Sequence, residues 1–182
     1  GRIRLTRIGE SVRVESRLYM SELINQKTTI FDEQVSRKPN KYPWTEKFIE
    51  AMHNGFWTDK EFSFKSDYHE FKTQLTDQER EIIIRTLSAI GQIEVAVKSF
   101  WAKVGENLPH PSIADLGYVM ANVEVIHNNA YERLLSVLDM EDVFEENLKL
   151  EWIQGRVKYL KKYTHRFYKD SRKQYLYALI LF

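Results

Sequence analysis

Two long segments with a helical repeat of apolar residues, joined by a short turn, constrain the fold of this chain more than any other feature. The first begins at Thr76-Asp77-Gln78-Glu79, a capping box in which the Thr hydroxyl and the Glu carboxylate satisfy free N–H groups of the first turn. Its apolar residues recur every three or four positions to about residue 105. The second starts at Ser112-Ile113-Ala114-Asp115 and runs to about Val137, after a turn over 107–111 that holds two prolines. This pattern predicts an antiparallel pair of helices within a bundle.

The remaining segments predict shorter helices around this pair. We expect one helix over 44–53, a third long helix over 140–163 and a further helix from about residue 170. The segment after Trp57 is expected to be a loop that carries Asp67, His69 and Glu70.

The start of the chain has a different character. Residues 2–5 and 12–14 alternate between polar and apolar side chains, as short strands do, or belong to an arm that is ordered only by its neighbours. We therefore expect an N-terminal arm over 1–40 and an all-α helical domain over 41–182.

Composition excludes several classes of protein. The 182 residues include no cysteine, which excludes disulfides, thiolate zinc sites, iron–sulfur clusters and cysteine nucleophiles. The 27 Lys and Arg nearly cancel the 26 Asp and Glu, and a net charge of +1 argues against a nucleic-acid binder. No apolar run reaches the ~18 residues that span a bilayer. We expect a cytoplasmic protein with no membrane or nucleic-acid partner.

Three side chains of the helical pair form a candidate metal site. Glu124 and His127 are three positions apart and share one face of a helix, which is the ligand spacing of di-metal carboxylate bundles. Glu94 lies in an apolar run of the preceding helix, where an unpaired acid is costly to bury. It lies 14 residues before Leu108, the middle of the turn, and Glu124 lies 16 residues after it. At ~1.5 Å rise per residue, the two carboxylates differ in level by only ~3 Å.

Less specific explanations exist for the same residues. Glu124 and His127 could be a surface pair or include a core histidine, and Glu94 could point to solvent from the rim of the apolar stripe. Tyr131 follows His127 by four positions, on the same stripe. A phenol close to a redox-active metal pair can be oxidised to a radical, whereas elsewhere Tyr131 would be an ordinary core residue.

The combined pattern resembles a known family. Glu124-x-x-His127-x-x-x-Tyr131, with an acid about thirty residues earlier, is similar to the small, radical-generating subunit of class I ribonucleotide reductase. Two further stretches support the resemblance, which covers roughly 40–182. They are Phe56-Trp57-Thr58-Asp59-Lys60-Glu61, followed by Ser66-Asp67, and the segment from Glu94 to Trp101.

The resemblance implies a ferritin-like fold and a role for each matching residue. Glu94 would be the ligand on the first helix, Glu124 a bridging carboxylate and His127 a terminal ligand. Tyr131 would be the radical tyrosine, and Trp57 would relay an electron between the metal site and the partner subunit. The implied cofactor is a dinuclear site, Fe/Fe or alternatively Mn/Mn or Mn/Fe, which is activated by an oxygen-derived oxidant. The implied partners are a second copy in a homodimer and a large catalytic subunit, on which ribonucleotides are reduced to deoxyribonucleotides.

This chain departs from the family pattern in one large respect. The family places one more Glu and a second Glu-x-x-His on two later helices, and the sequence holds no equivalent of them. Glu50-Ala51-Met52-His53 has the right spacing, but it lies upstream of Trp57 on a short helix and fits a solvated face. We therefore expect an incomplete bundle with half of a metal site. The other half would come from a second polypeptide or from a segment outside these 182 residues.

Two other functions remain open from the sequence. One is a different ferritin-like di-metal oxidase, although such proteins do not need both Tyr131 and Trp57. The other is a metal-free helical interaction module that docks through its aromatic tail. The tail consists of Tyr159, Tyr163, Phe167, Tyr168, Tyr175 and Tyr177. The basic residues interleaved with this tail over 158–173 fit a solvated helix face better than an RNA contact.

Overall fold

A computed structural model describes residues 29–162, 164 and 172–181 of the chain. Its contacts divide the chain into two units, 1–30 and Phe31–Phe182, and all the helices below belong to the second unit. The strand candidates at 2–5 and 12–14 lie outside the described residues. The boundary expected at residue 40 stays a prediction.

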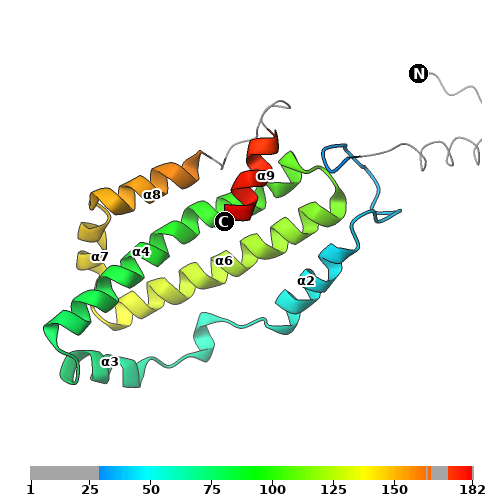
Figure 1. Ribbon diagram of the computed structural model, residues 1–182. Coiled ribbons are helices and arrows are strands. Elements are labelled where there is room, and N and C mark those ends of the chain that lie inside the picture. The colour runs from blue at the N-terminus through cyan, green and yellow to red at the C-terminus, as the bar shows by residue number, and fades with distance from the viewer. Residues whose placement is uncertain (1–28, 163, 165–171, 182) are drawn as a thin grey trace, which may run out of the picture. The chain divides into compact units, whose positions relative to one another are not determined.

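The described residues are helical and contain no strand, which confirms the all-α prediction. Figure 1 shows the helices in chain order. They are α2 (Trp44–Asn54), the single 3-10 turn η1 (Asp59–Glu61), α3 (Lys65–Thr73), α4 (Asp77–Ala102), α5 (Val104–Asn107), α6 (Pro111–Val137), α7 (Glu141–Asn147), α8 (Glu151–Lys161) and α9 (Arg172–Leu181). Over the described part of the chain, no helix combines the length and the apolar character needed to cross a bilayer.

Helices α4 and α6 form the predicted antiparallel pair, and they run side by side in Figure 1. The expected capping box starts α4. Glu79 N–H donates to the Thr76 hydroxyl at 3.3 Å, and Thr76 N–H donates to the Glu79 carboxylate at 2.8 Å. Both bonds satisfy amides that the first turn of a helix leaves without partners, so the start of α4 follows from local sequence.

The start of α6 differs from the predicted one. His110, not Ser112, caps this helix, because its Nδ1 accepts a hydrogen bond from Ser112 N–H at 3.2 Å. Pro111 occupies the first helical position, where its fixed φ is favourable and its missing N–H costs nothing. Asp115 instead forms an ion pair with Arg37 at 3.0 Å.

Close contact between the two long helices depends on Gly117. A Cβ built at this position would lie 2.7 Å from the carbonyl oxygen of Trp101 and 3.0 Å from Cβ of Val104. Real Cβ atoms do not approach backbone so closely, so only glycine allows α6 to pass this near to the end of α4. The contact fixes the register of the pair near its turn.

Two predicted elements are wrong in detail. The expected loop after Trp57 contains α3, a mostly polar helix that buries Phe71. The expected continuous helix over 140–163 is divided at 148–150 into α7 and α8. The Asn147 side chain at the end of α7 donates to the Ser88 hydroxyl of α4 at 3.0 Å, and α8 then runs along α4 on the side away from α6 (Figure 1). Neither feature carries a glycine or proline signal in the sequence.

Two groups of side chains hold the helices together. Phe71, Leu135, Leu138 and Met140 form a buried cluster where α3, α4, α6 and α7 meet. Farther along α4, the buried ring of Phe100 stacks on Tyr175 of α9 with a centroid distance of 5.2 Å. The segment of α4 between these two packed regions carries Glu94.

Candidate metal centre

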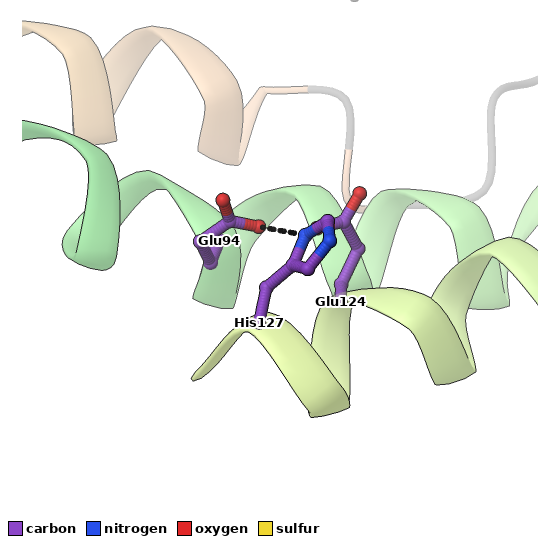
Figure 2. Close-up of side chains that lie close together, drawn as sticks. All are labelled: Glu94, Glu124 and His127. Carbon is purple, nitrogen blue, oxygen red and sulfur yellow. Dashed lines mark hydrogen bonds and ion pairs between the residues drawn. The ribbon is translucent and has the colours of Figure 1, made fainter. Parts of the chain in front are cut away.

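Glu94, Glu124 and His127 meet between α4 and α6, as the sequence predicts. Glu94 comes from the middle of α4, and the other two side chains lie one turn apart on α6 (Figure 2). Nδ1 of His127 is 3.0 Å from a carboxylate oxygen of Glu124 and 3.7 Å from one of Glu94. One ligand atom from each residue lies within 4.8 Å of the others. In the described part of the chain, this is the only such group of three or more potential metal ligands.

The three side chains are largely withdrawn from water. The Glu94 and Glu124 side chains are 13% and 10% exposed, whereas His127 is 33% exposed. Glu94 therefore does not point to solvent, and Glu124 does not belong to a surface pair. Charge at such depth requires a partner, because burial penalises an isolated carboxylate.

The pKa of Glu94 reflects this burial. Burial raises the pKa of Glu94 from 4.5 to about 7, and hydrogen bonding and repulsion from Glu124 add to the rise. His127 acts in the opposite direction. Two buried carboxylates that share one imidazole do not both ionise readily near neutral pH. A divalent cation would remove that penalty, and carboxylate oxygens with an imidazole nitrogen suit iron or manganese. The donor set therefore fits a metal.

Tyr131 lies close to the same group. Burial raises the pKa of its phenol, and the charges of Glu94 and Glu124 raise it further. Its Cβ would be 3.6 Å from a Cβ built on Gly91, three positions before Glu94 on α4. Tyr131 thus faces the helix that carries the first ligand, and its phenol stays protonated at neutral pH.

The indole of Trp57 covers the imidazole of His127. Their ring centroids are 5.9 Å apart and the planes differ by 28°, which is a stacked arrangement. Phe62 packs edge-on against Trp57, with their ring centroids 5.3 Å apart. Trp57 is half-buried and precedes η1 by two residues. The structure therefore brings both aromatic candidates, Tyr131 and Trp57, to the predicted ligands.

Several other candidate residues stay away from this site. Glu50 and His53 are exposed on α2, which agrees with the solvated face expected for them. Asp67, His69 and Glu70 are exposed on α3.

Two residues that make hydrogen bonds near the candidate site were not identified from the sequence. Asn128 donates to the backbone carbonyl of Glu124 at 2.7 Å, and Arg133 donates to the carbonyl of Asp59. A helical face count places Asn128 one turn after Glu124, but nothing local pairs Arg133 with a residue 74 positions away.

Comparison with known proteins agrees with this geometry. Residues 34–182 match the family model of the ribonucleotide reductase small chain. The chain belongs to this family. The family match confirms the resemblance read from the segments around Trp57, Glu94 and Glu124.

Individual relatives support the family assignment at low identity. The chain is 26% identical over 137 residues to the ribonucleoside-diphosphate reductase subunit beta of Halalkalibacterium halodurans, covering 71% of this chain and 39% of that protein. It is 23% identical over 136 residues to a protein assigned as the small subunit in Invertebrate iridescent virus 3, covering 74% and 34%. The chain therefore spans about two fifths or less of these relatives.

A crystal structure assigned to a class I ribonucleotide reductase of Bacillus halodurans is also similar. Its TM-score is 0.58 at 26% identity, over 63% of this chain and 42% of the other. The likeness confirms the predicted ferritin-like helical fold. Family membership also implies a dinuclear metal site, for which Glu94, Glu124 and His127 are the candidate ligands.

Proposed function

We propose that this chain forms the first half of the dinuclear metal site of a class I ribonucleotide reductase small subunit. The observation that carries the proposal is the convergence of Glu94, Glu124 and His127 between two helices of a chain from this family. The completed protein generates the oxidant that starts the reduction of ribonucleotides to deoxyribonucleotides on a large catalytic subunit.

Each ligand has a distinct role in holding the metal pair. Glu94 would bind from α4, Glu124 would be the shared carboxylate and His127 would bind from the following turn of α6. When bound, an Fe/Fe, Mn/Mn or Mn/Fe pair supplies oxidising power drawn from oxygen or a reduced oxygen species. The raised pKa of Glu94 favours a proton on its carboxylate, and binding of a cation would require that proton to leave.

The aromatic residues connect the site to the reaction. Tyr131 holds a phenolic proton close to Glu94 and Glu124, so one-electron oxidation of its ring releases that proton beside two carboxylates. Trp57 stacks on His127 and lies on the route by which an electron reaches the site from outside. Both roles are inferred from where Tyr131 and Trp57 lie, and they add to the function inferred from the ligands.

The full protein needs more than the described residues. We propose that another Glu and a second Glu-x-x-His complete the site, from a second polypeptide or from a segment outside these 182 residues. We further propose a homodimer that works in the cytoplasm with the large subunit.

The test is metal loading of the protein together with its complementing ligands. Inductively coupled plasma mass spectrometry is expected to find a metal pair in the native protein and its loss in Glu124→Ala and His127→Ala. Circular dichroism should show that both variants keep their helices.

Glu132→Gln is the matched control, because Glu132 is exposed on the same helix as Glu124. It is expected to load normally. Native protein that takes up only trace iron or manganese would refute the proposal and favour a metal-free interaction module. Electron paramagnetic resonance before and after hydroxyurea separates a radical subunit, whose signal is quenched, from another di-metal oxidase.

A further inference from the structure

One side chain joins α6 to the segment that carries Trp57, here taken as residues 56–64. Arg133 Nη1 donates to the backbone carbonyl of Asp59, and the same nitrogen lies 3.9 Å from the Asp59 carboxylate. Its guanidinium also lies over the ring of Phe64, 5.6 Å from the centroid. Arg133 therefore contacts Asp59, the first residue of η1, and Phe64, three residues after the end of η1.

Hydrogen bonds and ring contacts also link residues within the Trp57 segment. Thr58 N–H donates to the Glu61 carboxylate at 2.8 Å, and Glu61 N–H donates to the Thr58 carbonyl at 3.1 Å. Phe62 stacks on Phe64 at 6.0 Å and meets Trp57 edge-on at 5.3 Å. A shift of η1 would consequently move the indole of Trp57.

Polar anchoring of this segment depends on one residue. In the part of the chain that the structure describes, each hydrogen bond or ion pair between residues 56–64 and α6 is made by Arg133. The ring stack of Trp57 on His127 is a further contact with that helix, and η1 also packs on α6. Stacking alone tolerates sliding of one ring over the other, whereas a guanidinium bound to a carbonyl fixes position.

We infer that Arg133 is a positioning residue that fixes the indole of Trp57 over the imidazole of His127. The inference rests on the proposed function, since it assigns Arg133 to the electron path of the same site. Arg133 lies six positions beyond His127 on one helix, so ligand and anchor move together. The path thus keeps its geometry when the surrounding helices shift.

The first experiment measures the position of Trp57 without any metal. The chain holds four tryptophans, so 5-fluorotryptophan labelling gives four fluorine resonances, and Trp57→Phe identifies one of them. In Arg133→Met, the Trp57 resonance is expected to move towards its position in urea, with a larger solvent isotope shift. The other three resonances should stay in place.

Three variants sharpen this measurement. Asp59→Asn keeps the backbone carbonyl that accepts from Arg133, so it should resemble the native protein. Arg133→Lys keeps a donor that reaches the same carbonyl and should restore most of the native resonance. Arg85→Met removes an exposed arginine of α4 and is expected to leave Trp57 unchanged. If Arg133→Met does not fold, Arg133→Gln, which is too short to reach Asp59, takes its place.

Two results of the fluorine measurement would overturn the inference. One is an unmoved Trp57 resonance in Arg133→Met, and the other is an equal shift of all four resonances, which indicates general loosening. In the complete enzyme, Arg133→Met should lower nucleotide turnover roughly ten- to a hundredfold with unchanged metal content, as small misplacements of a reacting group do. Turnover at the native level would also contradict it. Absence of metal from the native protein would refute the proposed function, while the fluorine result would still decide the role of Arg133.

Discussion

Two carboxylates from different helices share one imidazole nitrogen at this site. His127 Nδ1 lies 3.0 Å from a carboxylate oxygen of Glu124 and 3.7 Å from one of Glu94. The cost of that arrangement falls on Glu94, whose pKa rises to about 7. The metal-free site is therefore most stable when Glu94 is protonated.

This ionisation predicts how stability changes with pH. The pKa of Glu94 is raised on folding, so the unfolded chain binds fewer protons between pH 4.5 and 7. The free energy of unfolding of metal-free protein should therefore fall as pH rises through that range, by up to about 3 kcal/mol. Urea denaturation at pH 5 and pH 8 measures the change. Glu94→Gln should remove most of it, and Glu81→Gln, an exposed position on the same helix, should not. An equal pH dependence in Glu94→Gln would contradict the assignment.

A second prediction concerns the phenol of Tyr131. Tyr131→Phe removes the oxidisable hydroxyl but no metal ligand, so metal content should stay at the native level. The tyrosyl signal in electron paramagnetic resonance should disappear. Tyr118→Phe is the control, because Tyr118 is 58% exposed on the same helix. A tyrosyl signal that survives in Tyr131→Phe and is lost in another tyrosine variant would place the radical elsewhere.

At the scale of elements, α4 performs two tasks on two faces. One face directs Glu94 towards α6, whereas a stripe spaced by four residues is buried. This stripe consists of Ser88, Gln92, Ala96 and Phe100. Ser88 accepts from Asn147 of α7, and Phe100 stacks on Tyr175 of α9. Ligand position is therefore tied to how later helices pack on α4.

Register between α4 and α6 gives a prediction at this scale. Gly117→Ala places a methyl group 2.7 Å from the carbonyl oxygen of Trp101, so the helices must separate. We expect a loss of about 1–3 kcal/mol in the free energy of unfolding, measured by urea denaturation.

Gly155 provides a matched control within α8. A Cβ there would meet nothing within 4 Å, so Gly155→Ala should raise the free energy of unfolding by about 0.5–1 kcal/mol. Equal effects of the two substitutions would show that helix propensity, and not close approach, sets the requirement at Gly117. Metal affinity should fall only in Gly117→Ala, because that change alone moves α6 relative to Glu94.

For the whole molecule, metal binding should raise the free energy of unfolding and the Tm. A cation that binds only the folded chain adds about 2.7 kcal/mol at a concentration 100 times its Kd, which for a protein of this size raises Tm by roughly 5–10 °C. Anaerobic differential scanning calorimetry with Mn²⁺ measures the shift. Glu132→Gln should keep it and His127→Ala should lose it. A shift that persists in His127→Ala would mean that the ion binds elsewhere.

Much of the pair α4–α6 could be predicted because its signals are local. The Thr76 capping box and the count of residues around Leu108 bring Glu94 and Glu124 to one level, and the structure confirms both. The proximity of the candidate ligands was predictable for the same reason, because a helix presents Glu124 and His127 on one face.

Other features depend on contacts distant in sequence and could not be predicted. The interruption between α7 and α8 accompanies the bond from Asn147 to Ser88, 59 positions earlier. Arg133 meets Asp59 across 74 positions. The polar helix α3 has one buried residue, Phe71, so its sequence shows no helical repeat of apolar residues. His110 caps α6 although histidine is an uncommon choice for that position.

The three candidate ligands come from a contiguous stretch, residues 94–127, within one helical hairpin. Closing a loop of that length costs little entropy, and contacts near in sequence form early in folding. On a ribosome, where chains emerge amino end first, this stretch leaves the exit tunnel before α8 and α9. A nascent polypeptide is therefore expected to form the hairpin that carries all three candidate ligands before α8 and α9 are available to pack on it.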